Sequence, residues 1–116
     1  MIFAHDTEVS LASTVALINT AHEPQDLTTR EELEAFVTAW EWTGSRTHDD
    51  AEFRQVLRLR DRLQKMWLAP EEELVEEVNA LLQDCRALPQ LVRHGKWDWH
   101  LHATRPEQPL AERMAV

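Results

Sequence analysis

The chain is poor in cysteine and in positive charge, and each shortage excludes a class of protein. Its 116 residues contain one cysteine, Cys85, so they can form neither a disulfide framework nor a cysteine-ligated zinc finger. Lys and Arg number 12 against 21 Asp and Glu, which gives a formal net charge of −9. Because binding to a phosphate backbone requires clustered cationic side chains, we expect these residues not to bind DNA by themselves.

Several familiar sequence signals are also missing. The chain has no signal peptide and no long apolar run, so a soluble cytoplasmic protein is the default expectation. It has no GxSxG nucleophile elbow, no GxGxxG or GxxxxGK[ST] phosphate-binding loop and no HExxH zinc helix. No repeat or low-complexity linker divides it, which favours a single domain over residues 1–116.

The apolar periodicity predicts a mainly α (α+β) fold with four helices packed against one C-terminal β-hairpin. The expected helices run from Thr7 to about Ala21, from Thr28 and Thr29 to a break at 43–45, from Asp49 to about Trp67, and from Pro70 through Cys85. A Gly95-Lys96 turn then joins two strands between Leu91 and Thr104. Near Pro109 a further helix begins, and we expect it to be incomplete at Val116.

The hairpin region is unusually rich in chemically capable side chains. Residues 91–104 hold two of the five tryptophans and three of the six histidines. Alternation along the second strand gives one face with Trp97, Trp99 and Leu101 and another with Asp98, His100 and His102. We expect the first face to pack on the helices. The second face has the spacing of a metal site, but polar or structural histidines without a metal are the favoured interpretation.

An arginine interrupts the apolar stripe of the third helix. Arg60 lies among the leucines and aromatic residues of that stripe, where a guanidinium needs a carboxylate, several carbonyls or an anionic ligand. An internal partner such as Asp26 or Asp98 is favoured, and stem burial with the charged head in water is another structural explanation. A ligand contact is the functional alternative.

Asn19 interrupts the first helix in the same way. The apolar arc of that helix is expected to include Leu11, Val15 and Ile18, with Asn19 beside it and its amide buried. The favoured role is to satisfy backbone groups of a neighbouring loop, and binding of a ligand is the alternative.

The remaining aromatic and reactive residues are assigned mainly to the core. Core packing is expected for Trp40, Trp67, Trp97 and Trp99, while the role of Trp42 is left open. Cys85 is expected to behave as a small apolar group. The candidate ligand contacts are Asn19, Trp42, Arg46, Arg60, His100 and His102. No catalytic residue, metal ligand or cofactor is assigned.

Several segments, taken in order, resemble the ABATE domain. They are FAHDTEVSLASTVALINTA, the Asp26-Leu27 pair, AWEWTG, VLRLRDRL, WDWHLHAT and PLAERMAV. The ABATE domain is the N-terminal part of the bacterial CGNR zinc-finger proteins, which are regarded as stress-induced transcription regulators. The resemblance therefore implies the regulatory half of such a regulator. DNA contact would then belong to a C-terminal zinc finger that these residues do not contain.

The sequence favours a regulatory or ligand-sensing function for an unidentified small molecule, without a membrane partner. One alternative is a protein-interaction or dimerisation module, in which exposed indoles and the last helix bind a partner or a second copy. Another is a small metal-dependent enzyme that uses the face of Asp98, His100 and His102, with Arg46 or Arg60 as an electrophile.

Overall fold

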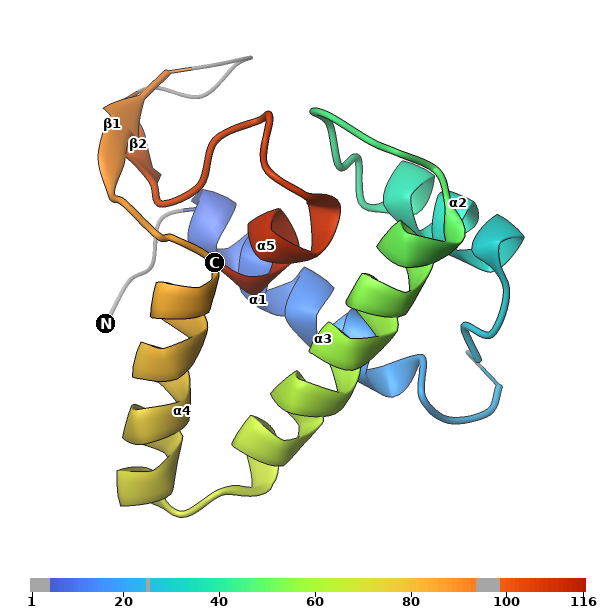
Figure 1. Ribbon diagram of the computed structural model, residues 1–116, viewed down its shortest axis with the longest axis horizontal. Coiled ribbons are helices and arrows are strands. Elements are labelled where there is room, and N and C mark those ends of the chain that lie inside the picture. The colour runs from blue at the N-terminus through green and yellow to red at the C-terminus, as the bar shows by residue number, and fades with distance from the viewer. Residues whose placement is uncertain (1–4, 25, 94–98) are drawn as a thin grey trace.

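The computed structural model describes residues 5–24, 26–93 and 99–116, which form five α-helices and a two-stranded antiparallel sheet (Figure 1). The elements are α1 (His5–Asn19), α2 (Arg30–Ala39), α3 (Asp50–Leu68), α4 (Glu71–Asp84), β1 (Gln90–Val92), β2 (His100–His102) and α5 (Leu110–Ala115). The mainly α fold with a C-terminal hairpin is confirmed. Within these ranges no helix combines the length and the apolar character needed to cross a membrane.

Local capping explains where α2 and α3 begin. The Thr29 hydroxyl accepts a hydrogen bond from the Glu32 amide at 3.2 Å, and the Glu32 carboxylate accepts one from the Thr28 amide at 3.2 Å. The Asp49 carboxylate accepts a hydrogen bond from the Glu52 amide at 2.9 Å. These bonds satisfy amides that the first turn of a helix leaves unpaired. Both predicted helix starts are confirmed.

The end of α2 directs the following loop. Glu41 has a left-handed backbone (φ 57°), and the Trp42 amide bonds back to the Val37 carbonyl at 3.0 Å. This is the geometry with which many helices end. The chain therefore turns sharply, and residues 42–49 form the loop that leads from α2 to α3.

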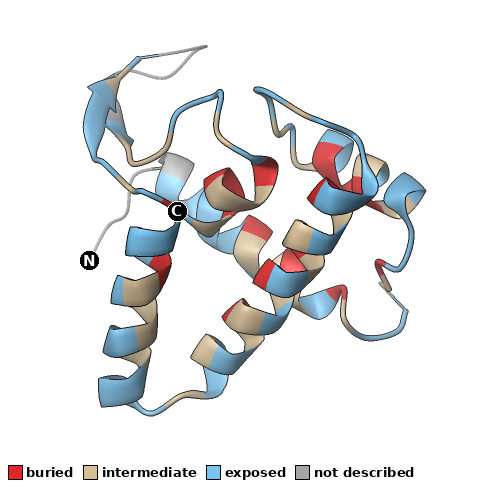
Figure 2. Ribbon diagram, viewed as in Figure 1, coloured by how far each residue is buried: buried red, intermediate tan, exposed pale blue. Residues whose placement is uncertain are grey.

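Helix α3 lies at the centre of the molecule and contacts α1, α2, α4 and α5. Its predicted apolar stripe is buried at Val56, Leu59 and Leu63. In α5, Leu110 is fully buried and Met114 nearly so, so the last helix belongs to the core. Figure 2 shows buried positions on α3 and on the helices round it. The buried apolar side chains are Leu17, Leu27, Leu33, Phe36, Val37, Val56, Leu59, Leu63, Leu81, Cys85, Leu110 and Met114.

The prediction for the inner side of α1 is wrong in part, although Ile18 of the predicted arc does pack against the core. Among residues 7–19, the part of α1 whose burial is described, Ser13 and Leu17 are buried, and so is Thr20 directly after the helix. Leu11 and Val15, expected in the core, are exposed, and so is Asn19, whose amide we expected to be buried. The reason is that α1 carries small or apolar residues on almost every side, so periodicity does not single out one face. The Thr20 hydroxyl is satisfied locally, since it donates to the Leu17 carbonyl at 2.6 Å.

The two strands pair antiparallel, as a hairpin requires, but they pack differently from the prediction. Leu91 is opposite Leu101 and Val92 is opposite His100 in an antiparallel register. Leu91 and Leu101 are exposed, and Trp99 is 64% exposed, so the expectation that this face packs on the helices is wrong. Alternation separates the two faces of a strand but does not say which one meets the core.

Parts of the hairpin prediction lie outside the described residues. They are the Gly95-Lys96 turn, Trp97 and Asp98. The expected packing of Trp97, and the metal or enzyme interpretation that needs Asp98, therefore remain predictions.

The tryptophans of α2 and α3 differ in burial. Trp40 is half-buried, packs against the core and has its ring centroid 6.3 Å from that of Phe36. Trp67 continues the stripe of Leu63 one turn further but is 64% exposed, so its predicted core role is wrong. Figure 1 shows the reason, because the joint between α3 and α4 projects beyond the other helices and leaves the last turn of α3 uncovered.

These burials predict a large effect for one leucine truncation and almost none for another. Leu110→Ala should lower the free energy of unfolding by about 3 kcal/mol, because it leaves a cavity at a fully buried position. Leu101→Ala, at an exposed position, should change it by less than about 0.5 kcal/mol. Urea denaturation followed by circular dichroism measures both. A large loss for Leu101→Ala would show that the hairpin face is covered after all.

Candidate functional site

A charge cluster with a buried centre joins the α2–α3 loop to both helices. Arg46 lies on this loop, and its side chain is only 9% exposed. Its Nη2 donates to Oε1 of Glu34 at 2.6 Å and to Oε1 of Glu52 at 2.8 Å, while Nε donates to Glu52 Oε1 at 3.0 Å. The Nδ1 atom of His48 lies 3.0 Å from Glu34 Oε1. One guanidinium therefore connects carboxylates from two different helices.

Glu52 is the most deeply buried member of this cluster, which comprises Glu34, Arg46, His48 and Glu52. It lies in the first turn of α3, and its side chain is 4% exposed. Its second carboxylate oxygen accepts a hydrogen bond from the Thr47 amide at 3.0 Å. Both oxygens are thus satisfied, as a buried carboxylate requires.

The environment keeps the two carboxylates and the guanidinium of the cluster ionised. Burial by itself would raise the pKa of Glu52, but hydrogen bonds from Arg46 and the Thr47 amide outweigh it and hold that pKa below its ordinary value. The hydrogen bond with His48 is the main cause of a lowered pKa for Glu34. Burial would lower the pKa of Arg46, but its bonds to Glu52 and Glu34 raise it. Both carboxylates and the guanidinium are therefore charged at neutral pH.

Three members of the cluster also have the chemistry of metal ligands. Glu34, His48 and Glu52 each offer one donor atom, and these atoms lie within 4.8 Å of one another. However, Nη2 of Arg46 already bonds both carboxylates. A divalent ion would have to displace this guanidinium, so the donor set fits an internal cation and we assign no metal to it.

A second buried arginine connects α5 to the same loop. Arg113 is 7% exposed, and its Nε donates to the Gln108 carbonyl at 2.9 Å. Its Nη1 and Nη2 atoms donate to the carbonyls of Thr43 and Ser45. Burial, and then the nearby charge of Arg46, lower the pKa of Arg113. Three backbone carbonyls therefore bind the Arg113 guanidinium, and no carboxylate of the described ranges forms an ion pair with it.

Gly44 allows the loop to wrap round this arginine. It has φ 96°, which side chains rarely tolerate, and a Cβ atom there would lie 2.5 Å from Nη1 of Arg113 and 2.8 Å from the Pro106 carbonyl. The Ser45 amide donates to the same Pro106 carbonyl at 2.8 Å. The loop is thus attached to α5 and to the segment before it.

A cavity of about 200 Å³ lies between the α2–α3 loop, which carries Arg46, and the segment that leads into α5. Gln55 of α3 and Gln108 contribute to its wall. Its charged lining residues are Arg46, Asp49, Glu52 and Glu107. Acidic groups therefore outnumber basic ones round this cavity.

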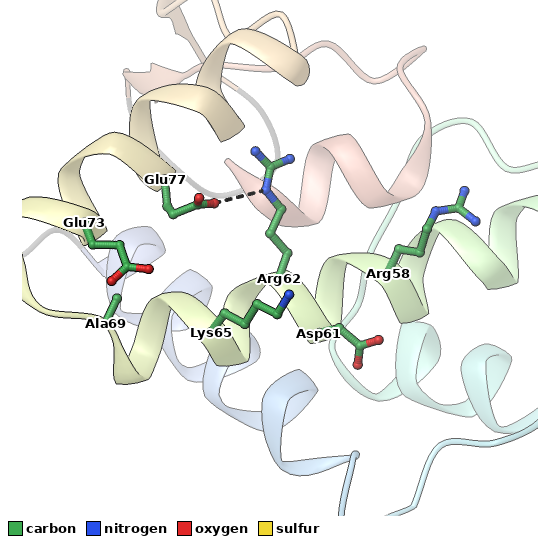
Figure 3. Close-up of a pocket in the computed structure, with 7 residues that line it drawn as sticks. All are labelled: Arg58, Asp61, Arg62, Lys65, Ala69, Glu73 and Glu77. Atoms are coloured by element: carbon green, nitrogen blue, oxygen red, sulfur yellow. Dashed lines mark ion pairs between the residues drawn. The ribbon is translucent and has the colours of Figure 1, made fainter.

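A larger groove of about 350 Å³ lies between α3 and α4 (Figure 3). Its α3 side carries Arg58, Asp61, Arg62 and Lys65, and its α4 side carries Glu73 and Glu77. The Nε atom of Arg62 lies 3.9 Å from Glu77 across the groove.

Arg60 finds backbone partners. Its Nη1 donates to the carbonyls of Thr20 at 3.1 Å and Leu27 at 3.0 Å, while its Nε is buried without a partner. Carbonyls were one of the predicted solutions. The prediction that Asp26 pairs with Arg60 is wrong, since no carboxylate within residues 5–24, 26–93 and 99–116 forms an ion pair with Arg60. The other predicted partner, Asp98, lies outside those ranges.

The other candidate ligand contacts do not gather in one place. Trp42 is half-buried, and its Nε1 donates to Ser13 Oγ at 3.3 Å, which links the loop to α1. Asn19 is exposed at the end of α1. His100 and His102 both belong to β2, and His102 is half-buried. Of those candidates whose side chains the structure describes, Arg46 alone lines either of the two cavities above.

Sequence reasoning missed three residues that organise this site. These residues are Glu34, Glu52 and Arg113. Arg113 had a signal of the kind that identified Arg60, because it stands next to Met114 on the apolar side of its helix. The pairing of Glu34 with Arg46 had no local signal, because the two residues lie on different segments.

The chain thus forms a mainly helical fold in which the buried Arg113 attaches the last helix to the α2–α3 loop. A family model described as "ABATE: Putative stress-induced transcription regulator" matches residues 11–116. The chain therefore belongs to the ABATE family, as the sequence resemblance predicted. No curated protein and no solved structure gives a significant match to it.

The ionised state of Glu52 predicts acid-sensitive stability. Its folded-state pKa lies below the ordinary value of 4.5, so its contribution is present above that pH and is lost as the pH falls through the folded-state pKa. Glu52→Gln should therefore cost about 3 kcal/mol at neutral pH, because Arg46 loses a buried partner. The difference from the wild type should shrink below pH 4.5.

Urea denaturation of both proteins across this pH range measures the difference. Glu72→Gln, at an exposed position on α4, is the matched control and should follow the wild type at every pH. A constant gap between wild type and Glu52→Gln would contradict the assigned ionisation.

Proposed function

We propose that this chain is the regulatory domain of a transcription regulator and that another part of the protein contacts DNA. Membership of a family described as regulators supports the class. The net charge of −9 supports a role away from the phosphate backbone. Following the ABATE resemblance, we assign DNA contact to a cysteine-ligated zinc finger of the parent regulator, in the cytoplasm.

The domain senses a small molecule at the cavity beside Arg46. The observation that carries this proposal is the double attachment of residues 43–47, through Arg46 to α2 and α3 and through Arg113 to α5. A ligand in the cavity would touch both the Arg46 loop and residues 107–110. Binding would therefore be linked to the position of α5. The acidic lining favours a polar or cationic ligand over an anion.

An interaction module is the second candidate function. The exposed apolar side chains of the hairpin, Leu91, Trp99 and Leu101, favour it, because grouped exposed apolar residues often mark interfaces. The two functions are compatible, since one domain can bind an effector and a protein at different surfaces. We propose no catalytic role for the chain.

If another part of the protein contacts DNA, this chain alone should not retard DNA in a gel. Electrophoretic mobility of duplex DNA with residues 1–116 should be unchanged at physiological salt, because phosphates and a chain of charge −9 repel each other. A salt-sensitive shift at submicromolar protein would place a DNA-binding surface within the chain and overturn the proposal.

A further inference from the structure

The face formed by α3 and α4 is divided by charge. Helix α3 exposes Arg54, Arg58 and Lys65, and none of them forms an ion pair with another residue of the described ranges. These residues are spaced by four and seven positions, so they share one side of the helix. Helix α4 contains no basic residue, and its acidic residues are Glu71, Glu72, Glu73, Glu76, Glu77 and Asp84.

The groove between the two helices is the boundary between these charges. Figure 3 shows Arg58, Arg62 and Lys65 rising from α3 on one side and Glu73 and Glu77 standing on α4 on the other. Arg62 alone crosses it, with 3.9 Å to Glu77 and 2.8 Å to Asp84. Asp61 is the exception, because it is an acid on the α3 side. Most of the remaining charges on both sides are left to solvent.

We propose that this face binds a second copy of the chain. A two-fold axis along the groove would place α3 of one copy opposite α4 of the other, and the same contact would then occur twice. Basic side chains would meet acidic ones in both halves of the interface. The divided charge makes the face complementary to itself, which a uniformly acidic face is not.

The overall charge is the reason to choose a second copy at this face. Two chains of charge −9 repel each other over most orientations, so association requires a surface where opposite charges meet. The α3–α4 face supplies both signs side by side. Apolar contact is available from Leu68, which is exposed three residues after Lys65, and from the aliphatic stems of the arginines. A stable interface of ordinary size needs about 800 Å² from each partner.

This inference goes beyond the proposed function and does not depend on the cavity or its ligand. It assigns the α3–α4 face to self-association and leaves the hairpin face free for other partners. A paired regulatory domain would bring two DNA-contacting parts of a regulator together, which suits recognition of paired half-sites.

Charge reversal on each half of the face tests the proposal. The acidic variant carries Arg58→Glu with Lys65→Glu, and the basic variant carries Glu73→Lys with Glu76→Lys. Sedimentation equilibrium in the micromolar range should give the wild type twice the mass of one chain. Each variant alone should be monomeric, since like charges would face each other in both halves. An equimolar mixture of the two variants should recover the doubled mass, because every contact again joins opposite charges.

A matched control separates the effect of charge on the α3–α4 face from the effect of net charge. Glu31→Lys with Glu41→Lys changes two exposed residues at either end of α2 and gives the same net charge as the basic variant. This control should dimerise like the wild type, and circular dichroism should show that all variants are folded. A monomeric wild type, a control that is monomeric, or a mixture that stays monomeric would overturn the proposal.

Discussion

Two buried guanidinium groups hold the α2–α3 loop, and the position of the last helix depends on them. Arg46 projects from the loop to Glu34 and Glu52, while the loop carbonyls of Thr43 and Ser45 receive Arg113 from α5. Both guanidinium groups are buried. Removing a partner would therefore leave a buried charge uncompensated, and the loss of folding free energy would exceed the net contribution of the intact interaction. The loop is therefore fixed from both sides, although it is neither helix nor strand.

This arrangement connects the core to the candidate site. Leu110 of α5 is fully buried, so a displaced helix would uncover apolar surface as well as Arg113. The cavity beside Arg46 borders the same loop and the entry to α5. A molecule that binds one position of the loop more tightly would shift the equilibrium of the attached helix by at most that difference in binding free energy. The proposed sensing would then work through a change in how these two arginines are bound.

The sequence predicted the parts of the structure that depend on neighbouring residues. The helix starts at Thr29 and Asp49 follow from side chains that bond amides three residues away. The inner side of α1 could not be predicted, because both Leu11 and Leu17 suit a core and only the packing of α3 and α5 decides between them. The charge cluster was missed for a similar reason. Glu34, Arg46 and Glu52 come from three segments, and an ion pair across segments leaves no periodic signal.

Hydrogen exchange of backbone amides tests the central claim most directly, when the wild type is compared with Arg113→Met. Methionine keeps much of the apolar stem but removes the bonds to Thr43 and Ser45. We expect the amides of Ser45 and α5 to lose protection together, by about tenfold or more, while those of α4 keep theirs. Loss of protection in α5 with an unchanged loop, or no loss in either segment, would contradict the account.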